Sequence, residues 1–538
     1  MSRVYVTERK DFTGGLNFRS DQFQLADNES PSMLNVEIDP RGGVFSRGAM
    51  RRINTSAPAG TWAPKTLFPL SGNNPRLMLS TSDRILHSSG SNFTEVLSAL
   101  STPLVPSSAD GASFVQWGDT LYFGMGATAS GGGYRWKATD AYATALTESG
   151  TAPNPWQVTS NDAILKMPSC EHVIAHASKL FAANVVTGGV AYPNRIHWSM
   201  ENSPTNWEEF NYIDINGGGN GITGVAIASG QLIVFKPNAV YAVYGYDETN
   251  FNVVEISRNL GAGNRHSIAA TEGGVYFASY PEGMFFYNGS SITDLFANIR
   301  PIIELGYVTT GATSPLRIAM IGRRVWVSAP YLTSGPVAYP TVNFIYNPDL
   351  GINGAYTQFS SHDSRGLVAG CDWRNSSGDE YRVACHPTEP YVMQVDMYGN
   401  ESDNVTGTDT GFPSTYRTKW FDASTYAQKK MFRRPDFVVK ETTVPQNITI
   451  GVYHDFDEGV GNEARIFVLT QTPPANGLVW GSGLWGENWS SSAVSSTILT
   501  GANLGLARTV QLEFTGPVGQ QWGLNGIGYK YQTRKIKG

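Results

Sequence analysis

The sequence has few cysteines, no long apolar stretch and no signal-peptide core, and each of these features excludes a class of protein. The three cysteines, Cys170, Cys371 and Cys385, are too few for a disulfide framework in a chain of 538 residues. No apolar stretch approaches the ~20 residues that span a bilayer, and the first ten residues, MSRVYVTERK, lack the apolar core of a signal peptide. We therefore expect free thiols, no membrane span, and synthesis and assembly in the cytoplasm.

Clustered cations are also missing. The 39 lysines and arginines are outnumbered by 45 aspartates and glutamates, which gives a net charge of -6. No basic run is long enough to follow a phosphate backbone, and stable DNA binding draws its affinity from such runs. Stable DNA binding is therefore not expected. A mildly acidic surface is compatible with a conduit through which DNA slides without binding.

Helix signals are scarce, and strand and turn signals replace them. The best helix candidate, 298–305, is short and interrupted by Pro301. The 58 glycines, 29 prolines and 12% aromatic residues fit many short strands joined by tight turns. The composition predicts an all-β protein.

The clearest structural unit is 263–288, GNRHSIAATEGGVYFASYPEGMFFYN. Its apolar, β-branched and aromatic residues form three strand patterns separated by glycine and proline turns. A ribbon of three strands leaves one face in water and is marginally stable. The unit therefore needs neighbours of its own kind.

Similar transitions from turn to strand recur at an uneven period of roughly 40 to 55 residues, which matches a propeller blade better than a helical or leucine-rich repeat. They precede Ile85, Leu121, Leu180, Leu232, Val275, Val325 and Tyr381. We expect residues 61–410 to form a β-propeller of about six or seven blades. A series of separate β-sandwich domains would give similar signals and is the alternative.

Two segments flank the expected propeller. Residues 1–60 form an extended segment, in which 35–39 alternate as a strand with Val36 and Ile38 on one face. Its hairpin is expected to latch the ring by supplying outer strands of the last blade. Residues 411–538 contain about six alternating strands, which predict a C-terminal β-sandwich domain.

Groups of carboxylates suggest chemistry only weakly. Asp455, Asp457 and Glu458 lie close together, but the loop pattern and closing glutamate of an EF-hand are missing, so a solvated turn is expected. The adjacent pairs Glu208-Glu209 and Asp379-Glu380 would point to opposite faces of a strand. Neither pair could then act on one substrate as acid and nucleophile.

The possible metal ligands are incomplete. Cys371, Cys385 and His386 lack a C-x-x-C pair and a fourth ligand at zinc spacing. His172 and His176 are four residues apart, yet their neighbours predict a strand and the glutamate of a zinc helix is absent. We expect buried thiols and structural histidines, and no metal, cofactor or catalytic residue.

Two loops have unusual compositions. Residues 217–221, GGGNG, lack the lysine of a phosphate-binding loop, and no G-x-S-x-G elbow occurs in the chain. Trp480, Trp485 and Trp489 could stack on sugars or contact a protein, since tryptophan is common at interface hot spots. A protein contact is the interpretation that we favour, and the chain is not expected to be an enzyme.

Short motifs spread over residues 12–360 resemble one family of phage proteins. The opening GGLNFRSDQFQLADNESPSMLNVEIDPRGGVFSRG is similar to the start of the propeller-bearing tail nozzle (tail tubular) proteins of short-tailed phages. RIHWS at 195–199, PTNW at 204–207 and the strand pair that ends in YNG at 287–289 are similar to their blade motifs. The end of the chain also resembles their C-terminal part.

The resemblance implies a structural virion protein of the tail. Proteins of this family form a ring, a hexamer, below the portal and adaptor, which channels and gates phage DNA and offers attachment for tail fibres. The implied partners are other copies of the chain, adaptor and portal-side proteins, tail fibre proteins and, transiently, DNA. The alternatives are a receptor- or glycan-binding phage tail protein and a propeller enzyme that degrades glycans.

Overall fold

The protein is all-β, as the composition predicts. A computed structural model describes residues 4–127, 132–146, 167–218, 221–246, 250–279, 281–302, 304, 316–328, 343–350, 354–360, 367–386, 389–397, 402–440, 445–457, 461–472 and 496–533. Within these ranges, helical backbone is confined to a 3-10 turn, η1 (Arg265–Ser267), and to residues 300–302 and 304. All other regular elements in the described ranges are strands.

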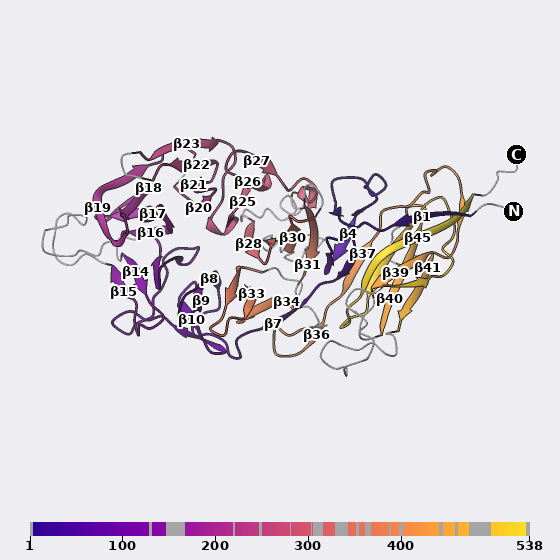
Figure 1. The fold of residues 1–538 in the computed structure, drawn as a ribbon, viewed down its shortest axis with the longest axis horizontal. Coiled ribbons are helices and arrows are strands. Elements are labelled where there is room, and N and C mark those ends of the chain that lie inside the picture. The colour runs from indigo at the N-terminus through magenta and orange to yellow at the C-terminus, as the bar shows by residue number, and fades with distance from the viewer. Residues whose placement is uncertain are drawn as a thin grey trace, which may run out of the picture.

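Seven four-stranded antiparallel sheets in the described residues form a propeller, drawn at the left of Figure 1 with β19, β23 and β27 on its rim. The first three sheets contain β8 (Pro64–Leu70), β9 (Arg76–Thr81), β10 (Ile85–Ser89) and β11 (Asn92–Glu95); β12 (Ser113–Trp117), β13 (Thr120–Gly124), β14 (Gly133–Trp136) and β15 (Thr144–Leu146); and β16 (Ser169–His176), β17 (Lys179–Thr187), β18 (Val190–Met200) and β19 (Ser203–Asp214).

The remaining four sheets continue the ring in chain order. The fourth and fifth contain β20 (Gly224–Ala228), β21 (Gln231–Lys236), β22 (Ala239–Tyr244) and β23 (Asn252–Ser257); and β24 (Ile268–Thr271), β25 (Gly274–Ser279), β26 (Gly283–Tyr287) and β27 (Ile292–Asp294). The sixth and seventh contain β28 (Arg317–Ile321), β29 (Arg324–Ser328), β30 (Asn343–Asn347) and β31 (Ala355–Phe359); and β32 (Gly370–Arg374), β33 (Glu380–Cys385), β34 (Val392–Met397) and β7 (Ala49–Arg52). The predicted propeller of six or seven blades is confirmed.

Tight turns between the strands explain why the repeat was visible in the sequence. The β20–β21 hairpin turns at Ser229 (φ 50°) and Gly230 (φ 74°), and the β17–β18 hairpin turns at Gly188 and Gly189, also with positive φ. Two residues with positive φ match the right-handed twist of the flanking strands in a two-residue hairpin. Glycine adopts this conformation at little cost, so the turn residues mark the start of each new strand.

The ring closes through a strand from the N-terminal segment. β7 pairs with β34 and completes the seventh sheet. Apolar side chains of the first and seventh sheets then pack together and form a continuous buried layer, made of Leu67, Leu77, Leu79, Leu86, Val383, Cys385 and Val392. The expectation that the hairpin at 35–47 would latch the ring is wrong in its detail, because the strand that follows this hairpin does so.

The C-terminal domain is a sandwich of two sheets, drawn at the right of Figure 1 with both chain ends at its far tip. The eight-stranded sheet contains β1 (Tyr5–Arg9), β5 (Val36–Ile38), β6 (Val44–Ser46), β38 (Lys430–Phe432), β39 (Asp436–Lys440), β42 (Ser496–Thr500), β43 (Gly505–Ala507) and β45 (Gly523–Thr533). The five-stranded sheet contains β4 (Ser32–Leu34), β37 (Ser414–Arg417), β40 (Gln446–His454), β41 (Arg465–Gln471) and β44 (Val510–Gly516).

The N-terminal segment therefore serves both domains. β1, β4, β5 and β6 complete the sandwich, β7 completes the propeller, and the short pairs β2 (Gly15–Leu16) with β3 (Glu29–Ser30) and β35 (Ser402–Asp403) with β36 (Thr410–Gly411) lie outside the main sheets. One hydrophobic core joins the fifth and sixth propeller sheets to the sandwich, with Tyr346 and Tyr356 on one side and Phe437 and Phe514 on the other. The two domains share this core.

Candidate functional site

The carboxylates singled out in the sequence brace turns. Asp455 Oδ1 accepts the N–H groups of Arg508 at 2.6 Å and Thr509 at 3.0 Å. Asp457 Oδ1 accepts the side-chain amide of Asn462 at 2.6 Å, and Glu458 lies outside the described residues. No group of three or more His, Cys, Asp or Glu side chains in the described part of the chain could hold a metal ion.

The cysteines and histidines have structural surroundings. All three cysteines are free thiols, and burial raises the pKa of each. His386 Nδ1 accepts the N–H of Glu389 at 3.0 Å. His172 Nε2 lies 3.2 Å from the carbonyl oxygen of Ile222, and burial lowers the pKa of this histidine to about 4. Burial also lowers the pKa of His176.

The other predicted candidates are dispersed. Glu208 is exposed on β19, and the side chain of Glu209 lies outside the described residues, as do Trp480, Trp485 and Trp489. Asp379 closes a turn with Asn375. Lys236 on β21 lies against the start of the loop at 217–221 and donates to the carbonyl of Gly217 at 2.7 Å.

A half-buried arginine, Arg265, links several sheets at the centre of the propeller, which we call the hub. Arg265, in η1 before the fifth sheet, donates to the carbonyls of Asp110 and of Glu171, the latter at 3.1 Å. Asp110 precedes the second sheet, and Glu171 lies on β16 of the third sheet. His266 Nε2 also lies 2.9 Å from the carbonyl oxygen of Asp110. These contacts link the second, third and fifth sheets across the centre of the ring.

Burial shifts the pKa values of three basic side chains near these contacts. Burial lowers the pKa of Arg265 to about 10 and the pKa of His266 well below its usual value. Burial, together with the charge of Arg317, also lowers the pKa of Lys65. The hydrogen bonds from Arg265 to backbone carbonyls are what hold this arrangement, since a guanidinium can serve several acceptors at once.

Replacing Arg265 with alanine is expected to loosen the hub. Two part-buried carbonyls lose a charged donor, which costs about 1 to 3 kcal/mol, and lysine should not rescue the change because it presents a single compact charge. Amide hydrogen exchange of residues 108–111 should accelerate in both variants. The exposed Arg258→Ala variant is the control, and equal protection in Arg265→Ala and the unmodified protein would contradict this role.

A fully buried arginine, Arg47, lies where the propeller meets the sandwich. We call its contacts with Asp403, Asn35 and Ser360 the joint. Arg47 Nη1 and Nη2 donate to the two carboxylate oxygens of Asp403 at 2.9 and 2.6 Å, and both side chains are fully buried. The guanidinium also donates to Asn35 Oδ1 at 3.0 Å and to the carbonyl of Ser360 at 3.1 Å. It lies 3.6 Å from the ring centre of Phe412. Nearly all of its donors therefore have partners, which a buried charge requires.

A chain of ion pairs continues from this joint into the propeller. Glu37 on β5 is buried and accepts from Arg324 Nη1 on β29 at 2.6 Å. The same nitrogen lies 4.0 Å from Asp396 Oδ2, which also lies 3.3 Å from Arg382 Nη1. Asp396 sits in the irregular pairing of β34 with β7 and has a positive φ of 56°. Such a bulge redirects a side chain at a backbone cost of about 1 to 3 kcal/mol.

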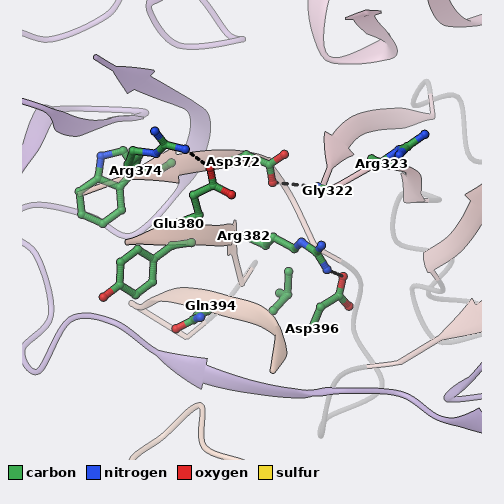
Figure 2. Close-up of a pocket in the computed structure, with 11 residues that line it drawn as sticks. Gly322, Arg323, Asp372, Arg374, Glu380, Arg382, Gln394 and Asp396 are labelled. Carbon is green, nitrogen blue, oxygen red and sulfur yellow. Dashed lines mark hydrogen bonds and ion pairs between the residues drawn. The ribbon is translucent and has the colours of Figure 1, made fainter. Parts of the chain in front are cut away.

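A cleft of about 700 Å³ opens beside these ion pairs, between the sixth and seventh sheets. Figure 2 shows Arg382 directed at Asp396, Asp372 reaching the backbone of Gly322, and Arg374 paired with Glu380. Arginine and carboxylate side chains are interleaved on its walls. Glu380 and Asp396 pair with arginines of this lining, whereas Asp372 accepts a backbone N–H from Gly322.

Asp396, beside the joint, should make the free energy of unfolding depend on pH. Burial, and then the charge of Glu37, raise the pKa of Asp396 to about 6, against about 4 in an unfolded chain. Between these values the folded state binds the extra proton, so stability falls as pH rises from about 4 to 6. The expected contribution is roughly 2 to 3 kcal/mol, since one pKa unit corresponds to about 1.4 kcal/mol.

Urea unfolding of an Asp396→Asn variant between pH 4 and 7 tests this expectation. In the unmodified protein, Asp396 makes the free energy of unfolding decrease as pH rises over that window. The variant should lack this decrease. Asp372→Asn removes an exposed carboxylate from the same cleft and is the control for the loss of a nearby charge. Parallel pH profiles for the unmodified protein and Asp396→Asn would contradict the assignment.

Comparison with known proteins adds little beyond the fold. No protein-family model and no curated protein matches the chain. Similar solved structures include the extracellular domain of a one-component system from B. thetaiotaomicron, with 10% identity, a TM-score of 0.39 and coverage of 74% of this chain and 44% of that one. Virginiamycin B lyase from Staphylococcus aureus has 10% identity, a TM-score of 0.39 and coverage of 65% and 99%. BBS1N in complex with ARL6DN has 11% identity, a TM-score of 0.38 and coverage of 67% and 99%.

The described residues include no helix long and apolar enough to cross a membrane.

Proposed function

We propose that this chain is a structural subunit of the tail of a short-tailed phage, a nozzle protein that assembles with other copies into a ring and channels and gates the genome. The ring is a hexamer in this proposal. The work of the subunit is mechanical, and it needs no catalytic residue.

The observation that carries the proposal links the opening motif to the joint. Asn35 and Glu37, from LNVEID, and Arg47, from SRG, are buried and hold the sandwich against the propeller. A subunit that bears load during ejection needs its two domains to move together. The residues through which the sequence resembles nozzle proteins are thus the residues that provide this rigidity.

The closed hub fits the same proposal. Arg265 bridges the centre of the propeller, so the path of the genome would lie between subunits, with propellers forming the wall around it. The net charge of -6 suits a wall along which DNA moves without being retained. Loops that project toward the axis would act as the gate, and other surfaces would receive the adaptor and the tail fibres.

The mass of the assembly tests the proposal. Light scattering of the purified protein, alone and mixed with the adaptor and portal-side proteins, should give a particle of about six chains in at least one of these conditions. A protein that stays monomeric or trimeric even with those partners would count against the nozzle. Glycan cleavage or saturable glycan binding by such a protein would instead support one of the two alternatives.

A further inference from the structure

Three basic side chains gather at the hub from different sheets, and we call them the hub cations. Lys65 lies on β8 of the first sheet, Arg265 on η1 before the fifth, and Arg317 on β28 of the sixth. These elements are neighbours, because η1 contacts β28, β28 lies beside β32, and β32 lies beside β8. Burial, and then the charges of all three hub cations, lower the pKa of His266. All three cations therefore lie near this one histidine.

The hub has more hydrogen-bond donors than its backbone can accept. The carbonyl oxygen of Asp110 receives Arg265 Nη2 and lies 2.9 Å from His266 Nε2 and 3.4 Å from Thr66 Oγ1. A carbonyl oxygen has two lone pairs for these three donors. Arg265 Nε is a buried donor with no acceptor among the described residues. Such a donor is costly unless a further acceptor serves it.

The other two hub cations have even fewer partners. Lys65 packs beside Asp110, since its Cβ would lie 2.6 Å from a Cβ placed on Gly111. Its Nζ forms no hydrogen bond or ion pair with a described residue. Arg317 donates only from Nη1, to the carbonyl of Val368 at 3.4 Å, within the part of the chain that the structure describes. Most of the five N–H groups of this guanidinium therefore still need acceptors.

Two carboxylates lie near the hub cations without pairing with them. Asp110 and Glu171 both oppose the fall that burial causes in the pKa of Arg265. Glu171 Oε1 instead accepts the backbone N–H of Ala127 at 2.9 Å, and neither carboxylate forms an ion pair with a hub cation in the described ranges. Three cations against two carboxylates leave a surplus positive charge beside unused donors. A compact anion with several acceptor oxygens would satisfy both.

We propose that the hub cations bind a small oxyanion, a phosphate or sulfate ion. Its oxygens accept from Lys65 Nζ, from Arg265 Nε and from the remaining N–H groups of Arg317. Guanidinium groups match the oxygens of such an ion two at a time, and a lysine adds a point charge. The ion ties the first, fifth and sixth sheets together at the centre of the propeller. The inference concerns a single chain and holds whether or not a ring forms.

Isothermal titration calorimetry with inorganic phosphate tests the site at neutral pH, with the ionic strength held constant by chloride. The unmodified protein should bind one phosphate per chain. Lys65→Gln removes no hydrogen bond to a described residue, so it should fold normally and raise the Kd at least about 10-fold, as expected for the loss of one charge-assisted hydrogen bond. Lys137→Gln, which changes an exposed lysine just after β14, is the matched control and should leave the Kd unchanged.

Asp110→Asn gives a result in the opposite direction. It keeps the carbonyl that Arg265 contacts and removes a negative charge beside the hub cations, so it should lower the Kd several-fold. A purely structural role for the hub cations would not produce tighter binding. An Asp110→Asn variant that folds and binds phosphate no better than the unmodified protein would contradict the proposal.

Urea unfolding separates binding from the general effect of the salt. Phosphate stabilises proteins by exclusion from their surface, which should raise the urea midpoints of all variants equally and without saturation. A bound ion stabilises saturably with its concentration, and Lys65→Gln should need at least about 10-fold more phosphate for the same gain. Equal, unsaturated gains in every variant would overturn the inference. Displacement of phosphate by a short single-stranded oligonucleotide would also overturn it, because the donors would then serve a nucleic-acid backbone.

Discussion

Replacing Arg47 with alanine should lower the free energy of unfolding by about 3 to 5 kcal/mol, the cost of leaving a buried partner charge uncompensated. Asp403 is fully buried and receives two hydrogen bonds from this guanidinium. The alanine also removes the contact with the ring of Phe412. Urea titration followed by circular dichroism measures the loss, and we expect the sandwich and propeller to unfold in separate steps in the variant.

Two further variants show whether the uncompensated charge is the cause. The double variant Arg47→Met with Asp403→Leu should recover much of the loss, because an apolar pair of similar volume can replace a buried ion pair at little cost. Arg374→Ala breaks the exposed pair with Glu380 and should change stability by less than about 1 kcal/mol. Equal losses for Arg47→Ala and Arg374→Ala would contradict the role assigned to the joint.

Replacing Met50 with alanine should cost about 2 to 5 kcal/mol, the range for truncating a large buried apolar side chain. Met50 lies on β7, the strand that completes the seventh sheet, and packs with Trp326, Ile345 and Met393 in the layer between the sixth and seventh sheets. The cavity would open at the closure of the ring. Protection of β34 amides from hydrogen exchange should therefore fall more than protection in the third sheet.

The neighbouring position supplies the control for this prediction. Arg51 lies on the same strand with its side chain 39% exposed, so Arg51→Ala should leave the urea midpoint within about 1 kcal/mol of the unmodified protein. If Met50→Ala lowered protection evenly over all seven sheets, the closure would have no special weakness and the ring would behave as one cooperative unit.

The architecture could be read from the sequence because its determinants are local. Turn pairs such as Ser229-Gly230 predict hairpins, and the aromatic strand at 275–278 predicts a sheet that is buried on both faces. Val275 and Phe277 pack toward the fourth sheet, while Tyr276 and Ala278 pack toward the sixth. The alternation of residues in a strand fixes both faces at once, which is why the propeller was predictable.

The joint and the hub were not predictable, because their partners are remote in the chain. Arg47 and Asp403 are 356 positions apart, and Arg265 reaches a carbonyl 155 positions away. No spacing rule links such residues, and a lone arginine in a glycine-rich context reads as a surface residue. The opening motif was the one available signal, since it contains Asn35, Glu37 and Arg47, but it did not identify what these side chains bind.

The latch was assigned to the wrong strand for a related reason. Val36 and Ile38 alternate with polar residues as an exposed hairpin would, yet Asn35 and Glu37 are also buried. They face the propeller and bind Ser360 and Arg324 there. Polar residues on a strand indicate solvent only when no second domain supplies their hydrogen bonds, and the alternation within one strand does not reveal that this hairpin packs between the two predicted domains.

Electron microscopy of negatively stained particles tests the central claim most directly. We expect ring-shaped class averages with six-fold symmetry and a central opening between subunits. The propellers in the wall should be solid because Arg265 bridges the hub of each. Adding the tail adaptor should leave this opening aligned with that of the adaptor. Isolated subunits in the presence of the adaptor, or an axial opening that runs through a single propeller, would contradict the account.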